Sequence, residues 1–333
     1  MNNSKIKQNQ SAIMGLVVGD ALGVPVEFTS RQERKQDPVV NMRAYGSHGQ
    51  PAGTWSDDSS MVVATMEWYN EHGKEGDDYK ALMDKFCSWS MHGEYTAYGS
   101  KFDIGLAVNR ALIKYSKGAE PINSGDLSEY SNGNGSLMRI LPTSLIHAKE
   151  LAEEDYKCVK KIYNMSSLTH AHARSKLACL IYSKIVADIM YKKDVEKVSI
   201  LEHSMASLNE YLINQEIDSD IRNESSFYNR VLDVMYLIHL DESEIKSSGY
   251  VVDTLEAAVW CFATTNSYSE CVLKAVNLGD DTDTVGAVAG GLAGLYYGLE
   301  NIPEEWINTI PKKRLDYEVG FGNDAIILQK NKC

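Results

Sequence analysis

The sequence predicts an all-α fold, and three observations support that prediction. Every convincing periodic segment has apolar residues three and four positions apart, as on one face of a helix. No alternating run is long enough for a central strand. The 333 residues contain no Gly/Ser- or Pro-rich linker and no internal repeat. We therefore expect a single domain over residues 1–333.

The composition is that of an ordinary soluble globular protein, 44% hydrophobic and 24% charged. A net charge of −13 argues against nucleic-acid binding over the surface, but leaves room for a local site for one anionic metabolite. Six cysteines without a C-x-x-C pair predict buried, reduced thiols. The N-terminus has no apolar signal core and no apolar run approaches a membrane span, so we expect a cytoplasmic protein.

The first predicted helix lies in residues 11–28 and carries Gly15, Gly19 and Gly23 on one face. Glycines spaced by four let another helix approach closely. Pro25 ends the helix, and Glu27 follows among apolar neighbours. Glu27 is either a surface residue beside buried ones or a ligand.

Two acidic turns each open a predicted helix. Ser56, Asp57 and Asp58 precede a helical run with apolar residues at 61, 62, 66 and 69. Asp280, Asp281 and Asp283 precede a glycine-rich apolar helix, and no Lys or Arg lies between Lys274 and Lys312. Each turn is either a helix cap or part of a cation site, because crowded carboxylates repel one another unless a positive charge or water lies among them.

The middle of the chain contributes further predicted helices. They lie at 77–92, from Asp103 to about 118, twice within 154–191, at 197–212 and 227–240, and from Asp253 after Tyr250. Asp103 is a good N-cap on its own. His170 and His172 are two apart and do not fit a zinc helix. A short helix starts at Pro303.

The loop at 119–135 ends in SNGNGSLMRILP, a glycine-rich turn that leads into a helix. Exposed N–H groups at a helix N-terminus suit a phosphate. The pattern is not the dinucleotide fingerprint, so it is weak evidence alone. We expect Arg139 within this helix, close enough to meet an anion.

All ligand atoms offered by the two acidic turns and Glu27 are oxygens. Oxygen ligands select hard cations such as Mg²⁺, Mn²⁺ or Ca²⁺ over zinc. The number of carboxylates exceeds what one divalent ion balances and suits two ions about 3.5–4 Å apart.

Seven segments carry a resemblance to a known family: GLVVGDALGVPVEF, TWSDDSSM, GSKFDIG, SNGNGSLMR, LTHAHARS, YVVDTLEAAVW and NLGDDTDTVGAVAGGLAGLYYG. In this order they resemble the ADP-ribosylglycohydrolases, and most closely the bacterial dinitrogenase reductase-activating glycohydrolases. The resemblance covers residues 11 to 310 or so. It implies a single compact, orthogonal multi-helix bundle around a cleft that holds two Mg²⁺ or Mn²⁺ ions.

The resemblance also implies roles for individual residues. The metal ligands would be Ser56, Asp57, Asp58, Asp281, Asp283 and Thr284, with Asp280 only a neighbour. The catalytic acids would be Asp58, Asp281, Glu27 and Asp103. The contacts to ADP-ribose would come from Asn132, Gly133, Gly135, Ser136, His170 and Tyr250.

Asp103 matches an acid of the arginine-linked branch, so the resemblance implies hydrolysis of ADP-ribosyl-arginine on a modified protein, with ADP-ribose as product. The ions would bind the distal ribose, a carboxylate of the cluster would take a proton from water, and Asp103 would assist departure of the guanidine. Alternatives are an O-linked substrate (ADP-ribosyl-serine, O-acetyl-ADP-ribose), a modified nucleic acid, a crystallin-like relative without catalysis, and a module that only binds ADP-ribose. We expect a monomer.

Overall fold

The computed structural model describes residues 3–192, 195–213 and 217–311. Within these ranges every regular element is an α-helix or a short 3₁₀ helix, and no strand is present, which confirms the predicted all-α fold. The chain forms two compact units, Met1–Ile104 with Asn266–Cys333, and Gly105–Thr265. The single domain over 1–333 stays a prediction.

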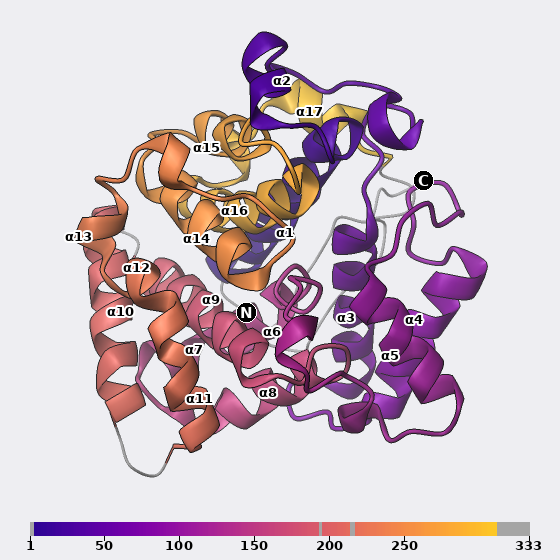
Figure 1. The fold of residues 1–333 in the computed structure, drawn as a ribbon, viewed down its shortest axis with the longest axis vertical. Coiled ribbons are helices and arrows are strands. Elements are labelled where there is room, and N and C mark those ends of the chain that lie inside the picture. The colour runs from indigo at the N-terminus through magenta and orange to yellow at the C-terminus, as the bar shows by residue number, and fades with distance from the viewer. Residues whose placement is uncertain (1–2, 193–194, 214–216, 312–333) are drawn as a thin grey trace. The chain divides into compact units, whose positions relative to one another are not determined.

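The first unit is built around a pair of long helices from opposite ends of the sequence. Its helices are α1 (Asn3–Gly23), α2 (Arg31–Gln36), α3 (Asp57–His72), α4 (Tyr79–His92), α15 (Tyr268–Val276), α16 (Thr282–Tyr297) and α17 (Glu304–Thr309). Helices α1 and α16 run side by side over most of their length, and α15 packs on α16 (Figure 1). Helix α3 contacts both α1 and α16.

Glycines make the close approach of α1 and α16 possible. A Cβ on Gly15 would lie 2.3 Å from the carbonyl oxygen of Gly290, and one on Gly19 would lie 2.1 Å from that of Gly286. One on Gly23 would lie 2.3 Å from the Cα atom of Asp283. Since no side chain fits at these distances, the small-residue faces predicted from the sequence are the contact between the two backbones.

The second unit surrounds α9 (Ala173–Tyr191). Its other helices are α5 (Leu106–Ser116), α6 (Leu141–Ile146), α7 (Ala148–Ala152), α8 (Val159–Ser167), α10 (Lys197–Ile213), α11 (Ser219–Glu224), α12 (Asn229–Leu232), α13 (Val234–Leu237) and α14 (Val251–Ala263). Helices α6, α7, α8, α10, α11 and α14 pack against α9. Because α9 is covered on all sides, even Lys184 is fully buried, and Asp188 neutralises it at 2.8 Å.

Several predicted boundaries were wrong. Helix α1 starts at Asn3, because polar residues continue the helix N-terminal to residue 11. Asp103 does not cap a helix: α5 begins at Leu106 after Gly105. The helix predicted around Arg139 begins at Leu141, and Arg139 lies in the turn before it. The segment 227–240 is interrupted between α12 and α13, and α15 was not predicted.

The structure tests two further expectations. The cysteines within the described residues are free thiols; four are buried and Cys87 is half-buried. This agrees with the predicted reduced state, although Cys333 lies outside the described residues. Among the helices of the described ranges, none combines the length and the apolar character that a membrane span requires.

Candidate functional site

The two acidic turns, more than 200 residues apart in sequence, meet in the first unit. Carboxylate oxygens of Asp20, Asp58 and Asp283 all lie within 4.8 Å of one another. The Thr284 hydroxyl donates to Asp58 Oδ2 at 3.3 Å. The chain therefore gathers acids from α1, α3 and α16 at one point, as the N-termini of α3 and α16 come together.

Helix capping explains the hydrogen bonds of the Ser56 side chain but does not explain the position of the Asp281 side chain. The Ser56 side chain, at the N-cap of α3, accepts the backbone N–H of Asp58 at 3.3 Å and donates to Asp58 Oδ2 at 2.9 Å. Asp281 is the N-cap of α16, but its side chain forms no capping hydrogen bond. Its carboxylate lies instead within 4.8 Å of ligand atoms of Glu27 and Asp283.

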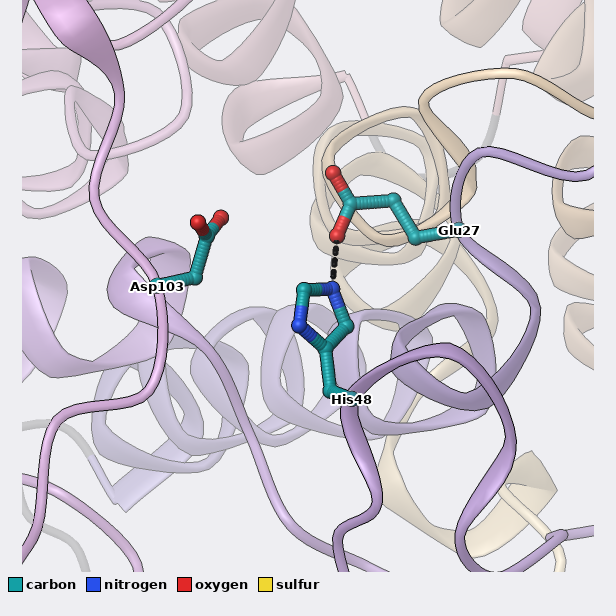
Figure 2. Close-up of side chains that lie close together, drawn as sticks. All are labelled: Glu27, His48 and Asp103. Carbon is teal, nitrogen blue, oxygen red and sulfur yellow. Dashed lines mark hydrogen bonds and ion pairs between the residues drawn. The ribbon is translucent and has the colours of Figure 1, made fainter.

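Glu27 connects this acid cluster to a third group. Ligand atoms of Glu27, His48 and Asp103 also lie within 4.8 Å of one another (Figure 2). His48 Nε2 pairs with Glu27 Oε2, as the dashed line in Figure 2 shows. Asp103 projects into the same space from the segment before α5.

Five carboxyl groups here have a raised pKa: those of Asp20, Glu27, Asp57, Asp58 and Asp283. Burial is the largest cause in each case, and for all but Asp20 neighbouring carboxylates add to it. The pKa of Asp57 is raised to about 8, that of Glu27 to about 7 and that of Asp20 to about 6. The pKa values of Asp58 and Asp283 are raised well above the usual range.

The cluster has the chemistry of a hard-cation site. No Lys or Arg of the described residues pairs with Asp20, Asp58 or Asp283. Asp58 Oδ1 is buried and has no hydrogen-bond partner among the described residues. A buried carboxylate oxygen without a donor is costly unless a cation satisfies it. The oxygen ligands fit Mg²⁺ or Mn²⁺ better than zinc, so the residues present fit the ions expected from the sequence.

The glycine-rich turn of the second unit is tied to the start of α14. Asn134 N–H donates to the carbonyl of Gly249 at 3.1 Å, and Val251 N–H donates to that of Asn132 at 3.0 Å. The Asn132 side chain is itself fixed, because Ser175 donates to its Oδ1 at 2.9 Å. The turn at 132–136 and Tyr250 are thus held side by side.

His170 supports this turn from inside the second unit. It is buried, and a Cβ on Gly135 would lie 2.8 Å from its Cε1 atom. Arg139 donates to Thr169 Oγ1, and that hydroxyl also hydrogen-bonds His170 Nδ1, at 2.9 Å in both cases. Burial, together with the charge of Arg139, lowers the pKa of His170 to about 3.

Comparison with known proteins shows to which family the chain belongs. The sequence profile of the ADP-ribosylglycohydrolases matches residues 1–329. The chain belongs to the ADP-ribosylglycohydrolase family. The fold agrees: a solved structure described as an ADP-ribosylglycohydrolase-related protein complex superimposes with a TM-score of 0.70 at 29% identity, covering 93% of this chain and 95% of that one.

Curated relatives within the ADP-ribosylglycohydrolase family include two enzymes named ADP-ribosylarginine hydrolase Tri1. The chain is 32% identical to that of Pseudomonas putida over 90% of its own length and 73% of the relative's. It is 30% identical to that of Serratia proteamaculans, covering 92% and 76%. It is 27% identical to the ADP-ribosyl-[dinitrogen reductase] glycohydrolase of Rhodospirillum rubrum, covering 95% and 94%.

The structure brings together most of the predicted acids. Glu27, Asp58, Asp281 and Asp283 belong to the three close groups, and Asp103 joins them through Glu27. Asp57 belongs to none of these groups, although it is buried and the charges of Asp103, Asp20 and Glu27 raise its pKa. Asp280 is exposed and absent from the groups, as expected for a neighbour.

The residues predicted to contact ADP-ribose all lie in the second unit, but their side chains differ in exposure. Gly133 and Tyr250 are partly exposed and their backbones are paired. Ser136 is fully buried and accepts a hydrogen bond from Ser166, so its hydroxyl stabilises the interior. Arg139, expected to be close enough to meet an anion, is buried and donates to Met165 and Thr169, and its contact with an anion stays a prediction.

Sequence reasoning missed Asp20, His48 and Arg174. Asp20 could have been recognised as a candidate from the sequence, since it is the only charged residue in 11–26. No sequence pattern pointed to His48, because its partner Glu27 lies 21 residues away and only the fold brings the two together. Arg174 lies over the Phe227 ring at 3.4 Å and donates to the Tyr250 hydroxyl at 3.0 Å, which fixes that aromatic side chain.

Proposed function

We propose that this chain is a metal-dependent ADP-ribosylarginine hydrolase that removes ADP-ribose from modified arginine side chains of proteins and works as a monomer. The observation that carries the proposal is the meeting of Asp58 and Asp283 within 4.8 Å, from two turns that share only oxygen ligands. The names of the Tri1 relatives support the arginine linkage, as does the presence of Asp103 beside Glu27.

Two Mg²⁺ or Mn²⁺ ions are the proposed cofactors. The residues proposed to hold them are Ser56, Asp57, Asp58, Asp281, Asp283 and Thr284. When bound, such ions bind vicinal sugar hydroxyls, stabilise negative charge and make a water more acidic. The buried, donor-free Asp58 Oδ1 supports this assignment, since a cation removes the cost of burying it.

Glu27, Asp58 and Asp281 are the proposed proton acceptors for the attacking water. Glu27 is the best placed of them, because it is shared by the acid cluster and by the group that contains Asp103. Burial raises its pKa to about 7, which is close to the value that suits a general base at neutral pH. Asp103 is proposed to hold the guanidine and assist its departure, since an unassisted guanidine leaves poorly.

The second unit is proposed to bind the ADP portion of the substrate. Backbone N–H groups at Gly133 and Gly135 suit phosphate oxygens, and Tyr250 offers an aromatic face for adenine. Asn132, Ser136 and His170 are proposed to complete the site. Ser136 and His170 are buried behind the turn, so their proposed role is to stabilise its conformation and not to form its exposed surface.

The linkage is tested by comparing release of ADP-ribose from arginine-linked peptides, serine-linked peptides and O-acetyl-ADP-ribose. We expect the arginine-linked peptide to be hydrolysed at least tenfold faster, and chelation of divalent ions to abolish the reaction. Asp283→Ala should lose the activity. Preferred hydrolysis of an O-linked substrate would reassign the substrate, and tight ADP-ribose binding without any turnover would make the chain a binding protein.

A further inference from the structure

His48 is held in place on three sides. It ends a 3₁₀ turn, Gly46–His48, and its ring packs against those of Phe28 and Phe102, with centroids 5.7 Å and 5.0 Å away. Its side chain is only 11% exposed. An imidazole fixed in this way has lost most of its freedom before it meets any partner, so a hydrogen bond that its ring forms is highly directional.

Among the residues that the structure describes, the hydrogen-bond partner of the His48 ring is the carboxylate of Glu27. His48 Nε2 reaches Glu27 Oε2, and the Glu27 side chain is 7% exposed (Figure 2). Glu27 is also the residue that lies within 4.8 Å of both Asp281 and Asp283. Holding one carboxylate oxygen against His48 fixes the plane of the carboxylate and hence where its second oxygen lies.

The turn that carries His48 is built against the same short segment of chain. A Cβ on Gly46 would lie 1.9 Å from the carbonyl oxygen of Pro25, so only glycine allows this approach. The Ser47 hydroxyl donates to the backbone carbonyl of Glu27 at 2.6 Å. The turn therefore makes two contacts with Glu27: Ser47 bonds the Glu27 backbone carbonyl, and His48 bonds the Glu27 carboxylate.

We propose that His48 is a positioning residue that orients the Glu27 carboxylate toward the cation position it shares with Asp281 and Asp283, so that Glu27 contributes an oxygen to this position in addition to the six residues named above. The proposal rests on the proposed function in assuming that this position is occupied during catalysis. Partners that orient metal-binding side chains typically contribute tenfold to hundredfold to metal affinity or activity. The competing explanation is that His48 only secures the 46–48 turn.

Three variants separate these explanations. His48→Phe keeps an aromatic ring in contact with Phe28 and Phe102 but removes the donor. His48→Gln keeps an N–H donor close to the position of Nε2. Ser47→Ala removes the hydrogen bond to the Glu27 carbonyl and leaves the carboxylate contact intact, so it is the matched control for the turn itself.

Mn²⁺ binding is measured by isothermal titration calorimetry on the full chain, together with melting temperature, kcat and KM. We expect His48→Phe to bind Mn²⁺ about tenfold more weakly and to lose kcat with KM within twofold of wild type. His48→Gln should recover most of both losses, and Ser47→Ala should retain wild-type Mn²⁺ affinity. In a Glu27→Gln background, His48→Phe should add no further loss.

Wild-type Mn²⁺ affinity in His48→Phe, or an equal loss in Ser47→Ala, would overturn the proposal. If His48→Phe does not fold, His48→Asn replaces it, because the shorter amide cannot reach Glu27 Oε2. The Mn²⁺ titration needs no substrate. A wild-type protein that fails to release ADP-ribose from arginine thus overturns the proposed function, while the titration still decides the role of His48.

Discussion

The carboxylate of Asp20, in α1, accepts the backbone N–H of Ser56, the N-cap of α3, at 2.9 Å and 3.1 Å from its two oxygens. It also accepts the N–H of Ser59 at 3.0 Å. Asp20 therefore satisfies N–H groups at the start of α3 that the helix itself cannot satisfy. Because α1 also packs on α16, this one side chain joins the first acidic turn to the helix that positions the second.

Asp20→Ala is expected to destabilise the protein by about 2–4 kcal/mol, since each buried donor left without a partner costs about 1–3 kcal/mol. It should also weaken Mn²⁺ binding, because the turn that carries Asp57 and Asp58 loses its anchor. Urea denaturation of the metal-free protein and Mn²⁺ titration measure the two effects. Asp20→Asn keeps one acceptor oxygen and should be the milder change; an equal loss in both variants would argue against the anchoring role.

Gly15→Ala is expected to cost about 2 kcal/mol or more in the free energy of unfolding. The new Cβ would lie 2.3 Å from the carbonyl oxygen of Gly290 and 2.8 Å from the Cα atom of Gly294, so the two backbones must separate. The higher helix propensity of alanine offsets at most about 1 kcal/mol of this.

A control for the glycine substitution is Gly105→Ala, where a Cβ would meet only Val108 Cγ2 at 3.9 Å. It should stay within about 1 kcal/mol of wild type in the same urea titration. If Gly15→Ala were as stable as this control, α1 and α16 would have to be able to separate at little cost, contrary to the packing observed.

Asp283→Asn is expected to leave the metal-free protein stable but to remove most of the extra stability that Mn²⁺ provides. Burial and neighbouring carboxylates raise the pKa of Asp283, so its ionised form destabilises the metal-free fold at neutral pH. The metal-free variant should therefore be at least as stable as wild type. Wild type should gain about 2.7 kcal/mol from Mn²⁺ at a hundredfold excess over Kd, and the variant should lose most of that gain.

Thermal and urea unfolding with and without Mn²⁺ provide the measurement for Asp283→Asn. Substitution of exposed Asp280 by Asn is the matched control in the same turn and should keep the Mn²⁺-dependent gain. A variant at Asp283 that is still stabilised by Mn²⁺ as strongly as wild type would remove this residue from the proposed ligands.

His170 is expected to make the protein sensitive to acid. Its folded pKa of about 3 lies below the usual value near 6.5, so between these limits the unfolded chain binds a proton that the folded chain does not. This contribution to stability is complete above about pH 6.5 and is lost as the pH falls, by up to about 1.4 kcal/mol per pH unit.

The acid sensitivity is measured by comparing wild type with His170→Gln in urea at pH 7.5, 5.5 and 4.5. The variant should be less stable at pH 7.5, because it loses the hydrogen bond to Thr169. The difference should shrink as the pH falls. A difference that stays constant over this range would show that His170 is not kept neutral by its surroundings.

Much of the helical framework followed from the sequence because periodicity and capping are local properties. Gly15, Gly19 and Gly23 predicted a close helix contact, and the structure places Gly290 and Gly286 against them. The turn of Ser56, Asp57 and Asp58 predicted the opening of a helix, and α3 begins within it at Asp57 with Ser56 as its N-cap. Where no local signal exists, the prediction missed: polar residues 3–10 continue α1, and Asp103 lies outside the helix it was expected to open.

The sequence by itself determined which residues carry the chemistry: two turns rich in carboxylates, each at the head of a helix, and a glycine-rich turn in another segment. Only the tertiary structure decided which of these groups meet. Asp20 and His48 became part of the site through partners 36 and 21 residues away. The physical reason is that helix formation depends on neighbours within a few residues, whereas burial, repulsion and hydrogen bonding among side chains depend on which helices pack together.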